Sequence, residues 1–196
     1  MQNRPPLKYL IAYSAYNDQV EANYESLFAR QRARGFDFEG FCVTPQTLND
    51  RHWLPFYQLD RRWKRNDCDL LSMYEALEEK LRLKDIFIVF NGANVHPDFL
   101  RNLSTFNVYM CWDDPDSSDL LSRPIAAHFD YCFTGNVSCI PLYQSWGIRN
   151  VEFLPILFFT EADYSLELTE SDVLEANRDV DIVFLGEMNV QRRDTL

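Results

Sequence analysis

Short apolar runs alternate with segments of helical periodicity along most of this chain. The runs are nearly continuous in apolar residues, which is typical of strands buried on both faces of a sheet. They cover residues 7–13, 36–43, 85–90, 106–112, 131–134 and 151–154. A repeated strand-then-helix order predicts a parallel sheet with helices on both faces. We therefore expect an α/β fold built on a Rossmann-like, doubly wound and mostly parallel sheet.

The segments between the expected strands carry helix signals. After Asn17, apolar residues at helical spacing form one face, and Gly35 supplies a stop (Val20, Tyr24, Leu27, Phe28). A second amphipathic helix is indicated by Leu70, Met73, Tyr74, Leu77 and Leu81. Pro97 and Pro115 are typical first-turn residues of two further helices, and another helix is expected to end at Gly147. Residues 44–66 are irregular and receive no assignment.

Composition excludes several functional classes. Acidic residues number 30 against 19 basic ones, so the net charge of −11 argues against a general nucleic-acid binder. None of the six glycines forms a G-x-G pattern, which excludes a P-loop and a dinucleotide-binding fingerprint. The five cysteines form no C-x-x-C motif, so reduced thiols are expected rather than disulfides or a zinc site. The first apolar run is too short for a signal peptide or membrane span, and we expect a cytoplasmic protein.

The sequence pattern changes after residue 156. Residues 161–181 are strongly acidic, and Thr169 and Asp172 have capping-box spacing. We interpret residues 157–180 as an acidic connector that follows a Rossmann-like domain over residues 1–156. Residues 181–186 then read as another buried strand, so residues 181–196 are expected to begin a second domain.

Four polar loops follow expected strands and are the candidate ligand-binding region. They are residues 14–17, 91–96, 113–118 and 135–136. Ligands of open α/β sheets bind outside the carboxyl ends of the strands, near a switch in strand order. We therefore expect these loops to converge on one rim of the sheet. Their candidate contact residues are Ser14, Tyr16, Asn17, Asn91, Asn94, Trp112, Asp116, Ser117, Gly135 and Asn136.

The loop at residues 113–118 holds three carboxylates. Asp113 or Asp114 could act as a general base, because mutual repulsion would raise the pKa of one of them. His96, with an ordinary pKa of about 6.5, is a third candidate base. Alternatively, Asp114 caps a helix beginning at Pro115, with Asp116 in its first turn, and His96 caps the helix at Pro97. The Asp114-Pro-Asp116 pattern is also compatible with a divalent metal.

An ordered series of motifs runs through the second half of the chain. Residues 108–115 place an Asp-x-Pro loop after a strand, and residues 129–134 contain a D-x-x-F-T strand. Residues 142–147 contain a Y-x-x-x-G helix end, and residues 151–155 a V-x-x-L-P strand. This series resembles the N-terminal half of CgeB-like (spore-maturation-type) glycosyltransferases. The resemblance is best over residues 106–196.

This resemblance implies a GT-B fold, in which two Rossmann-like domains face each other across a cleft. The first domain mainly holds the acceptor and the second mainly holds the nucleotide sugar. Such enzymes typically need no metal, because helix N-termini and basic side chains stabilise the leaving diphosphate. Residues of this chain on the donor side would be Gly186, Glu187, Arg192 and Arg193. Because the chain would lack nearly all of the donor domain, we expect it to be inactive alone.

Other interpretations stay open. The chain could be a non-catalytic, flavodoxin-like ligand-binding or interaction module, or another α/β enzyme such as a metal-dependent Asp-x-Asp transferase. A basic and aromatic segment at residues 51–65 could contact a lipid-linked acceptor or a membrane surface through Arg61, Arg62, Lys64 and Arg65. Alternatively, its aromatic residues pack onto the domain while its charges stay solvated.

Overall fold

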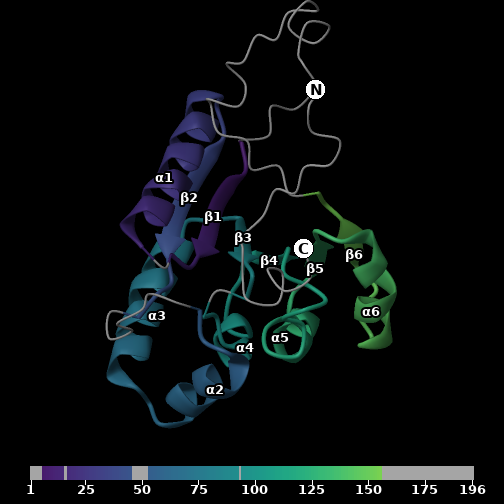
Figure 1. Ribbon diagram of the computed structural model, residues 1–196. Helices are drawn as coiled ribbons and strands as arrows, with labels where there is room; N and C mark the ends of the chain where they lie inside the picture. Colours follow the sequence, from purple (N-terminus) through teal and green to yellow (C-terminus); the bar gives the residue numbers. More distant parts are fainter. Residues whose placement is uncertain (1–5, 16, 46–52, 93, 156–196) are drawn as a thin grey trace, which may run out of the picture. The chain divides into compact units, whose positions relative to one another are not determined.

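A computed structural model describes residues 6–15, 17–45, 53–92 and 94–155 (Figure 1). Six strands form one sheet in the order β2-β1-β3-β4-β5-β6, and every neighbouring pair is parallel. The strands are β1 (Lys8–Tyr13), β2 (Asp37–Cys42), β3 (Ile86–Phe90), β4 (Phe106–Cys111), β5 (Tyr131–Thr134) and β6 (Val151–Phe153). The predicted α/β fold with a doubly wound, parallel sheet is confirmed. Each expected strand agrees with an observed one to within one residue at either end.

Helices connect the strands. They are α1 (Asp18–Ala33), α2 (Phe56–Lys64), α3 (Cys68–Leu81), α4 (Pro97–Leu100), α5 (Ser122–Ile125) and α6 (Ile140–Ser145), with 3-10 turns η1 (Ala126–His128) and η2 (Val137–Cys139). α1 begins after Asn17, whose side chain accepts a hydrogen bond from the Val20 N–H at 2.9 Å. Gly35 and Gly147 follow α1 and α6 with φ of +91° and +87°, so both expected stops are confirmed.

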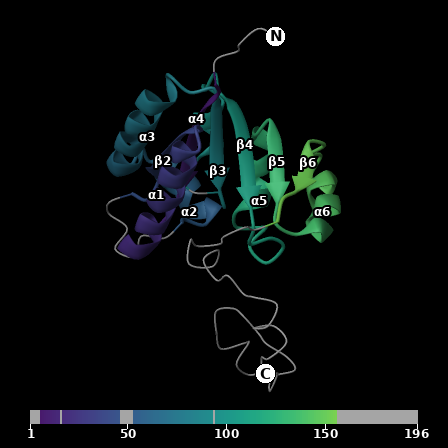
Figure 2. The ribbon, with the colours of Figure 1, turned by 90° about the horizontal axis from the view of Figure 1, so that it is seen from above.

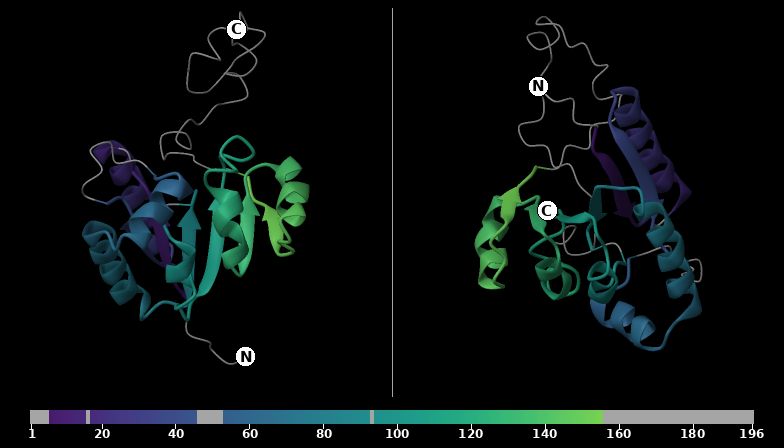
Figure 3. Two further views of the ribbon diagram at one scale, coloured as in Figure 1. Left: turned by 90° about the horizontal axis from the view of Figure 1, so that it is seen from below. Right: turned by 180° about the vertical axis from the view of Figure 1, so that it is seen from behind.

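The two faces of the sheet are covered by different helices. On one face α1 packs over β1 and β2 (Figure 2). Phe28 of α1 lies so close to Gly40 that a Cβ there would meet its ring at 2.4 Å. The opposite face packs against α2 to α6 and forms the larger core, around residues such as Leu77, Phe87 and Tyr143 (Figure 3, left). Right-handed crossovers explain this division, because the β1-to-β2 step runs along the sheet in the opposite direction to the later steps.

The strand order places the switch point between β1 and β3. The chain leaves β1 toward β2 on one side and returns to β3 on the other. The loops after these two strands diverge at this point, which is where open α/β sheets bind ligands. A ligand site is therefore expected at the carboxyl ends of β1, β3 and the neighbouring β4.

Two segments differ from the sequence-based expectations. Residues 56–64, which received no assignment, form α2, with Leu59 buried and Phe56 and Trp63 packed against the core. The expected helix at Pro115 is wrong, because residues 114–121 form turns and α5 begins only at Ser122. None of the helices in the described ranges has the length and apolar character needed to cross a membrane. The expected connector and second domain lie outside the described residues.

Candidate functional site at the carboxyl edge of the sheet

The loops after β1, β3, β4 and β5 lie at one edge of the sheet, because all the strands are parallel. Backbone hydrogen bonds join the starts of successive loops at this edge. The Asn91 N–H donates to the Met110 carbonyl at 2.7 Å, and the Gly135 N–H donates to the Cys111 carbonyl at 2.8 Å. The loop after β1 is joined to the end of β2, where the Ala15 N–H donates to Thr44 Oγ1 at 3.4 Å.

Asn91 ties the end of β3 to the end of β4. Its Oδ1 accepts a hydrogen bond from the Trp112 N–H at 3.0 Å, and its Nδ2 donates to Asp113 Oδ2 at 3.0 Å. Its backbone has a φ of +50°, which asparagine tolerates better than most residues. A left-handed backbone of this kind persists where the surrounding contacts enforce it, and such positions cluster at functional sites. Asn91 therefore orients the Asp113 carboxylate.

Trp112 forms an aromatic surface beside this pair. Its partly buried ring meets the Phe90 ring edge-on, with centroids 4.9 Å apart. The loop after β5 passes so close that a Cβ on Gly135 would lie 2.5 Å from Trp112 Cδ1 and 3.2 Å from its Cα. Only glycine allows this approach. Trp112, Asn91, Asp113 and Gly135 are thus held together from three different strand ends.

The Asp113 side chain at this edge is exposed to solvent. Desolvation by the surrounding protein raises its pKa above the usual range, and the negative charge of Asp114 adds to this rise. A solvent-accessible carboxylate with a raised pKa is a stronger base than an ordinary carboxylate, which is the property that a general base requires.

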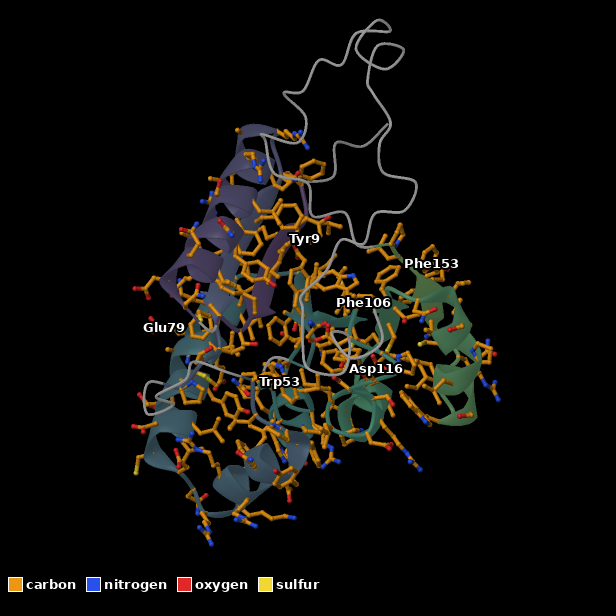
Figure 4. All side chains as sticks on the ribbon, in the orientation of Figure 1. Tyr9, Trp53, Glu79, Phe106, Asp116 and Phe153 are labelled. Carbon is orange, nitrogen blue, oxygen red and sulfur yellow. The ribbon has the colours of Figure 1, made fainter. Side chains whose placement is uncertain are left out.

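Asp114 has a different environment. It is only 5% exposed, and its Oδ2 accepts a hydrogen bond from the Tyr143 hydroxyl of α6 at 2.6 Å. The helix-capping interpretation of Asp114 is wrong, because no helix begins at Pro115 and the carboxylate is engaged by Tyr143 instead. Asp116 and Ser117 lie in the turns that follow, and Asp116 is exposed (Figure 4).

His96 is enclosed in the core under α2. Its ring stacks between those of Phe56 and Trp63, with centroid distances of 5.8 and 4.9 Å. Its Nδ1 accepts a hydrogen bond from the Asp98 N–H at 3.2 Å, so the side chain caps α4. Burial lowers its pKa, although the nearby Asp60 carboxylate opposes this effect. The structure therefore shows the capping arrangement.

The other candidate contact residues differ in accessibility. Asn94 is fully buried, and its side chain is occupied by hydrogen bonds to the Leu54 N–H and the Val43 carbonyl. Asn17 caps α1, and Asn136 caps η2 through the Ser138 N–H. Ser14 is partly buried at the end of β1. Tyr16 and the donor-side residues Gly186, Glu187, Arg192 and Arg193 lie outside the described residues.

Two of the four basic residues proposed for partner contact are paired within the domain. Arg62 forms two hydrogen bonds to Asp67, at 2.9 and 2.7 Å, and Lys64 pairs with Asp60 at 2.7 Å. Trp63 packs on the core and donates through Nε1 to Asp98 at 3.1 Å. These contacts favour the packing interpretation of this segment, while Arg61 and Arg65 remain exposed.

Sequence reasoning missed two features near this edge. Tyr143 was noted only as part of a motif, and its contact with Asp114 joins residues 29 positions apart, which no local pattern signals. A cavity of about 270 Å³ also opens beside the end of β2 (Phe41, Cys42, Thr44, Pro45, Asp69, Ser72, Met73, Ala76). Thr44 connects this cavity to the loop after β1.

The charge at the carboxyl edge is negative. Within the described ranges, the loops that follow the six strands contain no lysine or arginine (residues 14–15, 17, 43–45, 91–92, 94–96, 112–121, 135–139 and 154–155). The first turn of α1 carries Asp18 and Glu21, which oppose the attraction of the helix N-terminus for anions. Such an edge suits a neutral, hydroxyl-bearing ligand better than a phosphate.

In the part of the chain that the structure describes, no three His, Cys, Asp or Glu side chains lie close enough to share a metal ion. The five cysteines form no disulfide, and three of them are buried. Comparisons of the chain with models of known families, with curated proteins and with solved structures give no match.

Proposed function

We propose that this edge binds the acceptor of a GT-B glycosyltransferase, which transfers a sugar from a nucleotide sugar to an acceptor hydroxyl. One observation carries the proposal: Asn91 holds a solvent-accessible carboxylate, Asp113, beside the ring of Trp112 at the switch-point edge of the sheet. Carboxylate and amide groups bind hydroxyls, and an aromatic ring packs against the apolar face of a sugar. The protein would act in the cytoplasm.

In this mechanism Asp113 accepts the proton of the acceptor hydroxyl. The hydroxyl oxygen forms a bond to the anomeric carbon of the donor sugar as the bond from that carbon to the diphosphate breaks. The leaving nucleoside diphosphate carries away the electron pair, and its negative charge requires cationic groups. The acidic carboxyl edge supplies none in the described loops, so we propose that Arg192 and Arg193 meet the diphosphate, together with Gly186 and Glu187. No metal cofactor takes part in this proposal.

The exposed cations of α2 support a further element of the proposal. Arg61 of α2 and Arg65, which follows its last residue, are exposed and have no ion-pair partner among the described residues, unlike Arg62 and Lys64. They are the proposed contacts for an anionic, lipid-linked acceptor at a membrane surface.

A non-catalytic ligand-binding module is the alternative. The strand order begins 2-1-3-4-5, as in flavodoxin-like domains, which bind ligands at the same switch point without group transfer. In that case the Asn91, Trp112 and Asp113 cluster would hold a ligand but would not activate it.

Ligand mapping by NMR tests the site. Backbone amide spectra of this chain are recorded with a panel of neutral mono- and disaccharides and, separately, with uridine diphosphate. We expect sugars to shift the amides of residues 91–92, 112–118 and 135–136, and uridine diphosphate to leave them unchanged. Trp112→Leu should abolish the sugar shifts. Phe106→Leu, an exposed aromatic at the other end of β4, is the matched control and should preserve them. Two results would refute the acceptor assignment: amide shifts at this edge on addition of uridine diphosphate, or no amide shift there with any sugar of the panel.

A further inference from the structure

A small buried polar cluster lies beneath the candidate base. The Tyr143 hydroxyl donates to Asp114 Oδ2 at 2.6 Å, and the hydroxyl groups of Tyr109 and Ser122 are 2.9 Å apart. Tyr109, Ser122 and Tyr143 are fully buried and Asp114 is 5% exposed. The cluster joins β4, the start of α5 and α6 to the loop that carries Asp113.

The Asp114 carboxylate has no cationic partner among the described residues. The titratable groups that face it are Tyr143 of α6, Cys111 and Tyr109 of β4, Cys139 at the end of η2, and Asp113 of its own loop. None of these is a cation, and Asp114 Oδ1 has no hydrogen-bond partner among the described residues. Burial raises the pKa of the Tyr143 phenol, so the phenol stays protonated and donates to the carboxylate.

The buried Asp114 carboxylate lies next to the candidate base. Asp113 is next in the chain and is held by Asn91 at the solvent side of the same loop. A negative charge in a buried site is screened much less than one in water, so it disfavours a second negative charge nearby.

We propose that Tyr143 and Asp114 are positioning residues for Asp113. Tyr143 fixes the Asp114 carboxylate by its hydrogen bond, and the buried charge of Asp114 makes the Asp113 carboxylate a stronger base. The use of that base in catalysis rests on the proposed function, but the electrostatic coupling between the two aspartates does not.

Carboxyl-carbon NMR titration of Asp113 tests the coupling directly in this chain. Asp114→Asn keeps an oxygen that accepts from Tyr143 but removes the charge, so the pKa of Asp113 is expected to fall. Asp116→Asn removes an exposed charge from the same loop, whose effect water screens, and should leave the pKa of Asp113 unchanged. An unchanged Asp113 titration in Asp114→Asn would overturn the inference, as would an equal fall in both variants.

Tyr143→Phe provides a second test, which can still be carried out if Asp114→Asn fails to fold. Removing the hydroxyl leaves the buried Asp114 carboxylate without its hydrogen bond and favours its protonation. The pKa of Asp113 should then also fall, and the Asn91 side-chain amide signals should shift. An Asp113 pKa that stays at the wild-type value in this variant would contradict the positioning role.

The pH dependence of the transfer rate is a further test, because a purely structural role of Asp114 would not change it. A base works only when deprotonated, so the transfer rate falls as the pH drops through the Asp113 pKa. In Asp114→Asn this acidic limb should move to lower pH. If the protein transfers no sugar, the proposed function fails while the titration result stands. If transfer occurs and the limb does not move, the positioning role fails.

Discussion

Replacing Asp113 with asparagine is expected to lower the rate of sugar transfer by about 10²–10⁴-fold, the usual cost of removing a general base. Asparagine retains an oxygen that can accept the hydrogen bond from Asn91, so the local geometry should survive. It cannot take the proton of the acceptor hydroxyl. The measurement is kcat for sugar transfer by the protein as the cell makes it, across a range of pH.

Asp119→Asn is the matched control for this variant. Asp119 lies in the same loop, is exposed and pairs with Arg123 at 3.2 Å. Its replacement removes the same charge and should leave kcat near the wild-type value. The acidic limb of the wild-type pH profile should also disappear in Asp113→Asn. Equal rates in Asp113→Asn and the wild type would remove Asp113 as the base.

Asn94→Ala is expected to lower the free energy of unfolding by about 3 kcal/mol. Two buried backbone groups, the Leu54 N–H and the Val43 carbonyl, would lose their partners, at roughly 1–3 kcal/mol for each unsatisfied group. The φ of +48° adds a cost of about 1 kcal/mol for alanine. Urea denaturation measures the change, and Asn102→Ala, at an exposed turn position, should stay within about 0.5 kcal/mol of the wild type.

Asn94→Gly separates the two costs. Glycine adopts a positive φ without strain, so this variant should lose only the hydrogen bonds and should be about 1 kcal/mol more stable than Asn94→Ala. A loss below about 1 kcal/mol in Asn94→Ala would show that the two hydrogen bonds do not anchor the residue 53–54 segment to the loop after β3.

The strands could be predicted from the sequence because parallel strands buried on both faces leave a local signature. Leu10 and Ile11 are adjacent yet pack in opposite cores, so both must be apolar. α2 lacks such a signature, since mainly Phe56, Leu59 and Trp63 face the core between polar and basic residues. The sequence could indicate that His96 caps a helix because Pro97 follows it. It could not indicate that two aromatic rings enclose the His96 side chain, because both rings belong to α2.

The sequence predicted the loops and the candidate residues of the site, but not which of these residues contact one another. Strand order and direction place these loops at one edge, and both follow from the strand-then-helix pattern. The specific contacts depend on which strands are neighbours. Asn91 reaches Asp113 because β3 and β4 pair in register, and Asp114 meets Tyr143 because the loop after β4 folds against α6. Local sequence suggested a helix cap for Asp114 because Pro115 follows it, and tertiary burial overrode that preference.

Sugar transfer in the presence of EDTA tests the central claim most directly. The protein as the cell makes it is incubated with a panel of nucleotide sugars and candidate hydroxyl acceptors, and products are detected by mass spectrometry. The account predicts an acceptor heavier by one glycosyl residue, release of the nucleoside diphosphate, and the same rate with and without EDTA. If the nucleotide sugar stays intact with every acceptor although sugars bind at the carboxyl edge, glycosyl transfer is contradicted and the ligand-binding module is favoured. Transfer abolished by EDTA would contradict the metal-free mechanism.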